Sequence, residues 1–490
     1  MVLRIPSRLQ KAFDNPFIVV GGITLFGALL RLYHLGFKPL WYDEAVLYWI
    51  SNSGGIQQVV AQNATLNSAP PLFAILIHLI MNIGDSELAL RFIPWLGGVA
   101  VIPATYFLSR QFLEKVPAYF TAFVAAVAFT QVRYSQELRE YSLTFLTAAI
   151  ILALFYRELH HPTRSNWTLM TCAMALGIFL QYGLAMLVIA LNLVYAIHLL
   201  STVDDRKSRL IRWATSQIIV FGAVVAVYFL SLQQQMVIGF GASPTMNYLS
   251  GAYWNGSVIS LLQLAVLNTL AVFAFTFPDP FLLFMVAVGF VLILRDNRSR
   301  TALELFAVPF VLTFVAASAR LYPYLGDRQD MFLTPMIYVL AGFGFDRLTK
   351  IAQRRWVVPL LLAVVFLVGL GSSVGYESYG GTEDIRPIVS ALSTSFETGD
   401  RIYVYYSAKY AFTYYYRKNE DSTILGTRSR EDPNVYLQEI DSLLSTKGRL
   451  WIVFSHCFGN ECELITRHLS KARKSESIAS SNGPQLYLVR

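Results

Sequence analysis

Acids and arginines recur in the polar stretches that separate long apolar segments of this chain. The candidates for chemistry are three acids, three arginines and a tyrosine: Asp43, Glu44, Glu137, Arg91, Arg139, Arg328 and Tyr42. A carboxylate can act as a general base on a hydroxyl or an amine. A guanidinium fork matches phosphate oxygens and stays charged, so arginines can hold a phosphate while it leaves a sugar carbon. The set predicts group transfer from a phosphate-linked donor.

The composition places these residues in a membrane protein. The chain has 490 residues, of which 55% are hydrophobic and 14% charged, whereas soluble domains carry roughly 25% charged residues. The net charge of +8 does not indicate a nucleic-acid partner, because many Lys and Arg residues lie in short loops where they set topology. The basic start of the chain has no small-residue cleavage site before the first apolar segment, which is therefore expected to be a retained anchor.

Thirteen apolar stretches are candidate membrane spans. The stretch 70–83 is short for a span, and 258–276 is interrupted by polar residues, so both are expected to lie at the surface. Setting them aside puts the basic short loops on the cytoplasmic side, with the N-terminus inside and the C-terminus outside. About eleven spans result, within a range of 11–13: 17–33, 92–109, 117–131, 141–156, 167–182, 184–200, 212–231, 279–294, 302–319, 331–346 and 357–375.

This topology gathers the acids and arginines on one face of the membrane. The external regions are a first loop at 34–90 and further loops at 132–140, 233–257 and 320–330. Residues 1–375 form the membrane part, and 376–490 are expected to fold as a small extracytoplasmic α/β domain. Its expected strands and helices are 401–406, 450–455 and 485–489, and 384–394, 434–445 and 461–473.

Two cysteines in the C-terminal domain leave two interpretations open. Cys457 and Cys462 lie outside the cytoplasm in this topology, where a disulfide can persist. A zinc site with His456 is the alternative, but a fourth ligand is not evident. The disulfide or free thiols are favoured.

Four motifs occur in an order that resembles a known family: Asp43-Glu-Ala45, Pro70-Pro-Leu72, Ser86-Glu-Leu-Ala-Leu-Arg91 and Tyr134-Ser-Gln-Glu-x-Arg-x-Tyr-Ser-Leu143. The chain resembles the bacterial protein O-mannosyltransferase-like glycosyltransferases of the GT-C superfamily, together with the aminoarabinose transferases that modify lipid A. The likeness covers about 15–375 and is strongest over 40–145. It implies a GT-C fold and transfer of a sugar, with inversion, from a polyprenyl- or dolichyl-phosphate donor outside the cytoplasm. The resemblance leans bacterial, so the plasma (inner) membrane is the expected location.

The resemblance also suggests roles for single residues. Asp43 matches the catalytic acid of the first external loop and would be the general base, with Glu44 and Glu137 as orienting or second acids. Arg91, Arg139 and Arg328 would bind the donor phosphate, and Tyr42 the substrate. In this chain Gln329 stands where the family usually has Tyr after the arginine of its late motif.

Metal, partners and rival functions follow from the same residues. Some relatives carry an acid or His before Pro-Pro-Leu, where this chain has Asn67, Ser68 and Ala69, so no tightly held metal is expected; a divalent cation stays as the alternative. The expected partners are a polyprenyl-phosphate sugar donor, membrane lipids and a lipid, glycan or protein acceptor. A transporter or flippase of lipid-linked sugars, or an inactive scaffold subunit, are the alternatives. A transporter would favour polar residues at mid-membrane depth and broken helices in matching halves.

Overall fold

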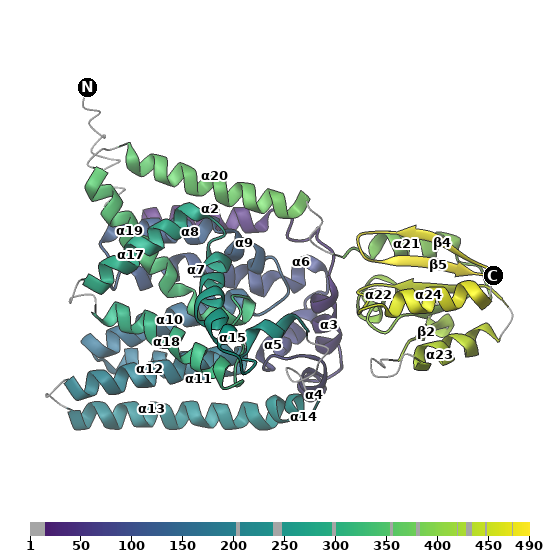
Figure 1. Cartoon of the computed structure of the whole chain (residues 1–490), viewed down its shortest axis with the longest axis horizontal. Coiled ribbons are helices and arrows are strands. Elements are labelled where there is room, and N and C mark those ends of the chain that lie inside the picture. Colours follow the sequence, from purple (N-terminus) through teal and green to yellow (C-terminus); the bar gives the residue numbers. More distant parts are fainter. Residues whose placement is uncertain are drawn as a thin grey trace.

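The computed structural model describes residues 15–201, 206–238, 247–295, 300–352, 356–378, 383–418, 420–427, 434–445, 448–472 and 474–490. A large helical part carries a smaller domain with a sheet at one end (Figure 1). The helix α20 (Val357–Ser378) continues slightly past the boundary expected at 375, and the division of the chain at that residue remains a prediction.

Each of the eleven segments expected to span the membrane is helical. These are α2 (Pro16–Leu32), α7 (Phe92–Ser109), α8 (Lys115–Val127), α10 (Tyr141–His160), α11 (Arg164–Leu180), α12 (Tyr182–Ser201), α13 (Arg206–Val227), α17 (Pro280–Arg295), α18 (Arg300–Ser318), α19 (Pro335–Ala352) and α20. By length and composition, six helices within the described ranges could cross a membrane, or seven if α8 and α9 (Phe129–Ser135) form one bent span. The described helices thus establish several apolar spans, and the number eleven remains a prediction.

The two stretches set aside from the spans behave differently. The first contains α5 (Leu72–Met81), whose 10 residues are too few to span a bilayer. The second, Val258–Thr276, is a 19-residue run of α15 (Val258–Leu262), η3 (Gln263–Asn268) and α16 (Thr269–Thr276). It is long and apolar enough to be a candidate span, whereas its polar residues predicted a position at the surface. In Figure 1 it nevertheless runs across the direction of α13.

A buried arginine explains how the chain bends after α8. The axes of α8 and α9 differ by 52° around Ala128. The guanidinium of Arg31, at the end of α2, donates from Nη1 to the carbonyl of Ala126 and from Nη2 to that of Ala125, each over 2.7 Å. The last carbonyls of a helix lack partners within it and carry partial negative charge. Arg31 therefore caps α8, and the chain turns toward the loop that bears Glu137.

The C-terminal domain is a mixed α/β fold. Its sheet has the order β2-β1-β3-β5-β4, built from β1 (Arg401–Val404), β2 (Thr423–Leu425), β3 (Leu450–Phe454), β4 (Ser475–Ser480) and β5 (Gln485–Val489). Strand β1 pairs in parallel with β2 and β3, and β5 pairs antiparallel with β3 and β4. Every side chain of β3 is buried, as expected of a central strand covered on both faces. The helices are α21 (Arg386–Ser395), α22 (Lys409–Tyr415), α23 (Asn434–Leu444) and α24 (Glu461–Ala472).

This domain is fastened to the first external loop. The hydroxyl of Tyr415 accepts a hydrogen bond from the backbone N–H of Leu40 over 2.8 Å and donates one to Glu87 over 3.0 Å. Arg417 pairs with Asp85 over 2.7 Å. These contacts join α22 and the residues directly after it to two parts of the loop. One is Leu40, just before α3 (Tyr42–Ser51); the other is Asp85 and α6 (Glu87–Leu90), which follow α4 (Ile56–Leu66) and α5. The C-terminal domain thus lies against the loop that carries the first candidate acids.

Candidate active site

Asp43 and Glu44 occupy the first turn of α3. Carboxylates are favoured there, because the N-terminus of a helix carries partial positive charge. Neighbouring residues of a helix point about 100° apart, so the two acids face different surroundings. Asp43 reaches Arg328, whereas Glu44 turns inward and is 1% exposed.

Asp43 forms an ion pair with Arg328. Its Oδ2 lies 2.7 Å from Nη1 of Arg328, and each side chain is 20% exposed, so the pair remains accessible. The guanidinium of Arg328 also lies over the rings of Trp41 and Tyr141, at 6.0 and 5.7 Å from their centroids. Burial raises the pKa of the Asp43 carboxyl, but the charges of Arg328 and Arg139 outweigh it and bring the pKa below its ordinary value. Asp43 is therefore ionised at neutral pH.

A tight turn sets the position of Arg328. The Oδ2 atom of Asp330 accepts hydrogen bonds from the backbone N–H groups of Leu325 and Gly326, over 3.0 and 2.8 Å. Gly326 has φ +75°, and a Cβ at this position would overlap the backbone of Ala271. Only glycine adopts this conformation without strain in such a narrow space. The turn then delivers Arg328 at the start of η5 (Arg328–Leu333).

Arg91 holds Glu44 rather than facing a cavity. Its Nε and Nη2 donate to the two carboxylate oxygens of Glu44 over 2.9 and 2.7 Å. Nη1 donates to the carbonyls of Leu35 and Lys38, and Nη2 also donates to that of Pro39, over 2.7 to 3.0 Å. A guanidinium has five N–H groups, and all five are used by these bonds. The sequence predicts that Arg91 binds the donor phosphate, but this geometry leaves Arg91 no N–H group for a phosphate.

Glu44 ties three segments of the chain together. Besides its bonds with Arg91, its Oε1 accepts from the backbone N–H of Leu138 over 2.6 Å. The first and second external loops therefore meet on this buried carboxylate. Glu44 is placed to hold the neighbouring Asp43 in position.

Arg139 and Glu137 lie in the second external loop, close to the Asp43–Arg328 pair. The Nε atom of Arg139 forms an ion pair with Glu140 Oε2 over 3.4 Å, and Nη2 donates to Asn67 Oδ1 over 3.4 Å. Burial, followed by the nearby charge of Glu44, raises the pKa of Glu137 to about 7, and its Oε1 lacks a partner in the described part of the chain. Buried polar atoms are nearly always paired. The Oε1 atom of Glu137 is therefore a candidate to bind a polar group that is not part of the protein.

The raised pKa of Glu137 predicts how stability changes with pH. Between its ordinary value of 4.5 and about 7, the folded protein binds more protons at this site than the unfolded chain does, so stability falls as the pH rises. We expect Glu137→Gln to lose this share of the pH dependence. The melting temperature of the variant minus that of wild type should therefore be more positive at about pH 8 than at about pH 5. Thermal melting in nanodiscs checks it.

A matched control separates this effect from general charge loss. Glu304 forms an ion pair with Arg300 on α18, and the arginine of this pair is exposed. Glu304→Gln should keep the wild-type pH dependence. The same dependence in Glu137→Gln as in wild type would contradict the assignment of the raised pKa.

The ring of Tyr42 faces the C-terminal domain. It stacks on the imidazole of His456 with centroids 4.0 Å apart and planes 3° apart, and it contacts Tyr410 and Phe458 edge-on. Cys457 and Cys462 form a disulfide beside this contact, which confirms one of the two interpretations and rules out a zinc site that uses both thiolates. Within the described ranges, no group of three His, Cys, Asp or Glu side chains is suited to a metal.

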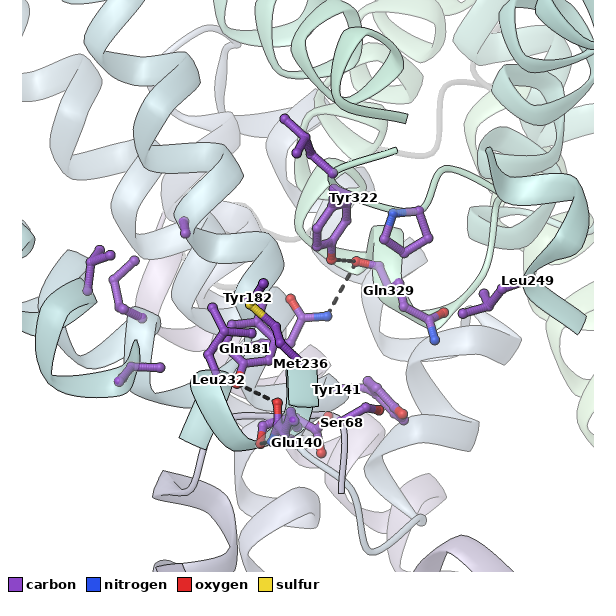
Figure 2. A pocket seen from close by; sticks show the side chains of 18 of the residues that line it. Ser68, Glu140, Tyr141, Gln181, Tyr182, Leu232, Met236, Leu249, Tyr322 and Gln329 are labelled. Atoms are coloured by element: carbon purple, nitrogen blue, oxygen red, sulfur yellow. Dashed lines mark hydrogen bonds between the residues drawn. The ribbon is translucent and has the colours of Figure 1, made fainter. Parts of the chain in front are cut away.

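An apolar cavity of about 360 Å³ opens beside Arg139. Its polar lining includes Glu140, Gln181, Tyr182 and Gln329, and its apolar lining includes Ile178, Val224, Val227, Leu232, Met236 and Leu249. Figure 2 shows Gln181 and Tyr322 directed at the Gln329 carbonyl, to which they donate over 3.3 and 2.9 Å. The side-chain Oε1 of Gln329 has no partner among the described residues. The cavity therefore joins an apolar wall from α11, α12 and α13 to a polar end at Arg139.

Sequence reasoning missed three neutral polar residues of this cavity, Gln181, Tyr182 and Gln235. Gln181 and Tyr182 sit at the junction of α11 and α12, and Gln235 bonds the Tyr182 hydroxyl over 2.8 Å. The only available signal was a polar dipeptide between two apolar segments, which equally fits an ordinary helix break. Of the predicted residues, the structure brings Asp43, Glu137, Arg139 and Arg328 together; Glu44 and Arg91 form a buried pair beside them, and Tyr42 faces the other domain.

Comparison with known proteins agrees with this architecture. The family model described as dolichyl-phosphate-mannose-protein mannosyltransferase matches residues 68–232, a range that includes Arg91, Glu137 and Arg139 but neither Asp43 nor Arg328. A search of curated proteins found no match.

Solved structures resemble nearly the whole chain. ArnT from Cupriavidus metallidurans, in the apo state, is 16% identical with a TM-score of 0.61, over 96% of this chain and 98% of that one. The same protein bound to undecaprenyl phosphate gives 15% and 0.62 over the same shares. An oligosaccharyltransferase from Archaeoglobus fulgidus is 14% identical with a TM-score of 0.54, over 89% and 67%. The fold and the family match confirm the resemblance, drawn from four motifs, to the GT-C glycosyltransferases that use polyprenyl-phosphate-linked donors.

Proposed function

We propose that this protein is a membrane glycosyltransferase that transfers a sugar from a polyprenyl-phosphate donor to an acceptor on the extracytoplasmic side, with inversion. One observation carries the proposal. An ionised carboxylate, Asp43, is paired with Arg328 next to Arg139, which lines an apolar cavity. A base, cations for a phosphate and space for a lipid chain thus adjoin one another.

The cavity fits the donor. Its apolar wall, from α11, α12 and α13, suits a polyprenyl chain, and Arg139 at its polar end suits the phosphate. Undecaprenyl phosphate was seen bound to the structurally similar ArnT, which supports a lipid-phosphate ligand for the same fold. The polar side chains of Gln181 and Gln329 lie where a sugar or phosphate oxygen could accept or donate a hydrogen bond.

Arg328 is shared between base and donor. In the free protein it pairs with Asp43 and keeps that carboxyl acidic. An incoming phosphate competes for the same guanidinium, which weakens the ion pair and makes Asp43 a stronger base. Asp43 then removes the proton of the acceptor while the acceptor oxygen or nitrogen attacks the sugar carbon, and the C–O bond to the phosphate breaks with the negative charge held by Arg139 and Arg328.

The remaining predicted residues support this step. Glu137, with a pKa near 7, carries a proton for part of the time at neutral pH and serves as the second acid beside the donor. Glu44 and Arg91 hold the start of α3 and so act as positioning residues. Tyr42 forms the wall toward the C-terminal domain.

Turnover of lipid-linked sugars tests the proposal. Purified protein in nanodiscs would be offered a panel of undecaprenyl-phosphate sugars, and release of free undecaprenyl phosphate would be measured. We expect turnover of at least one donor, faster in the presence of membrane extracts that contain acceptors. Binding of undecaprenyl phosphate without any turnover across the panel would favour a transporter or an inactive subunit instead.

Arg139→Met should weaken donor binding. Charge-assisted hydrogen bonds contribute about 1.5–3 kcal/mol each, so we expect the Kd for undecaprenyl phosphate to rise about 10- to 100-fold, as measured by intrinsic fluorescence or native mass spectrometry. Arg300→Met, at an ion pair that is 69% exposed on the arginine side, is the control. Equal affinities in wild type and Arg139→Met would remove Arg139 from the phosphate site.

A further inference from the structure

The loop that follows β3 places a histidine of the C-terminal domain next to α3. His456 has φ +51°, a left-handed conformation that is uncommon for residues other than glycine. The hydroxyl of Ser407 donates to the carbonyls of Ser455 and His456 over 2.7 and 2.9 Å. The next residue, Cys457, is bonded to Cys462 in the first turn of α24. The Ser407 hydroxyl, shared between two carbonyls, and the disulfide therefore hold one residue in an unusual backbone conformation.

The imidazole ring is restrained as well. Its Nδ1 is 3.0 Å from Oε1 of Glu383 and donates to that carboxylate, because an ionised carboxylate can only accept. Its face lies against the Tyr42 ring, nearly parallel, and its edge meets Phe458 at 4.9 Å between centroids. A histidine fixed at both its backbone and its ring presents a rigid flat surface to Tyr42.

Tyr42 is the residue directly before the proposed base. It is the first residue of α3, so contacts of its ring restrain the turn that bears Asp43. The rest of the first external loop is held from the other side by the Glu44–Arg91 pair. His456, Tyr410 and Phe458 all contact the Tyr42 ring, and the stack with His456 is the closest of the three, with centroids 4.0 Å apart against 5.9 and 6.0 Å.

We propose that His456 is a positioning residue for the reaction: the C-terminal domain completes the active site by holding Asp43 in place through the stack of His456 on Tyr42. This inference rests on the proposed function, because it takes Asp43 as the base. Strain stored at one residue and maintained by its surroundings is a feature found at functional sites. The loop from Ser455 to Cys462 therefore serves the membrane part of the chain, although it belongs to the sheet domain.

Three variants in nanodiscs test the proposal. His456→Ala removes the ring; His456→Phe keeps a flat ring for Tyr42 but cannot bond Glu383; His468→Ala, the control, removes a histidine of the same domain that is bonded to Asp441 on the surface. For each, one would measure kcat for release of undecaprenyl phosphate, the Kd for undecaprenyl phosphate, and amide hydrogen exchange over Tyr42–Ser51.

The expected pattern separates positioning from other roles. Because small misplacements of a reacting group cost up to about 100-fold, His456→Ala should lower kcat by roughly 10- to 100-fold with an unchanged Kd and faster exchange in α3. His456→Phe should restore most of the rate and of the protection, and His468→Ala should match wild type. A kcat loss in His456→Phe as large as in His456→Ala, with normal exchange, would overturn the proposal, because the imidazole itself would then be acting.

Failure of the proposed function gives a different result. If wild type turns over none of the donors, the function is wrong, and exchange still decides on the positioning. Faster exchange of Tyr42–Ser51 in His456→Ala than in His468→Ala supports it. Equal exchange in the two variants overturns it.

Discussion

Asp43→Asn is expected to abolish sugar transfer while leaving donor binding intact. The amide is nearly isosteric and can keep a hydrogen bond to Arg328, but it cannot accept the acceptor's proton. Loss of a general base costs typically 100- to 10,000-fold, so kcat should fall by about 1,000-fold. The readout is release of undecaprenyl phosphate by purified protein, together with the Kd for the same lipid, which should not rise, because the neutral amide competes with the phosphate for Arg328 less strongly than the carboxylate does.

Asp346→Asn is the matched control for this prediction. Asp346 pairs with Lys350 over 2.6 Å on α19, and the lysine is 61% exposed. This variant also removes one acid from an ion pair, but far from α3. Turnover by Asp43→Asn equal to that of Asp346→Asn would move the chemistry to another acid, with Glu137 the next to test.

Arg91→Met should give the largest loss of stability. It leaves Glu44, 1% exposed, as a buried carboxylate without a cation, a change that costs about 3–5 kcal/mol. Whole domains are stable by only about 5–15 kcal/mol, so little folded protein is expected. Arg91→Lys keeps the charge but loses the fork, and the three donors of an ammonium replace five. It should melt between Arg91→Met and wild type. Yield of monodisperse protein and the melting temperature are the measurements.

Two further variants show whether the buried pair is responsible. Glu44→Gln combined with Arg91→Met removes both charges and should recover part of the stability lost in Arg91→Met alone. Arg417→Met breaks a pair whose arginine is 58% exposed and should cost about 0–1 kcal/mol. If Arg91→Met melts like wild type but no longer binds undecaprenyl phosphate, Arg91 is a phosphate ligand after all.

Much of the fold follows from local patterns in the sequence. The apolar runs marked the helices, and the three strands β1, β3 and β5 were found because buried runs such as Leu450–Phe454 are apolar throughout. The strands β2 and β4 were missed. One has three residues, and the other reads Ser-Glu-Ser-Ile-Ala-Ser, whose polar side chains suit the edge of a sheet and give no clear alternation.

The site shows where local patterns stop. Asp43, Glu137, Arg139 and Arg328 could be chosen because ionised groups beside a membrane need a reason to be there. Arg91 uses three of its five N–H groups on the backbone carbonyls of Leu35, Lys38 and Pro39. Every residue has a backbone carbonyl, so the residue types give no sign of these contacts. Tyr42 meets a ring more than four hundred positions away, and no spacing rule reports such a contact.

Arg31 has a consequence for how the protein is made. Its carbonyl partner Ala126 lies 95 residues further along the chain, and synthesis proceeds at about 5–20 residues per second, so α2 exists for roughly 5 to 20 seconds before α8 does. A guanidinium near the end of a helix reaches the membrane–water boundary while it has no partner in the bilayer. The first helix can therefore enter the bilayer early but reaches its final depth only when α8 arrives.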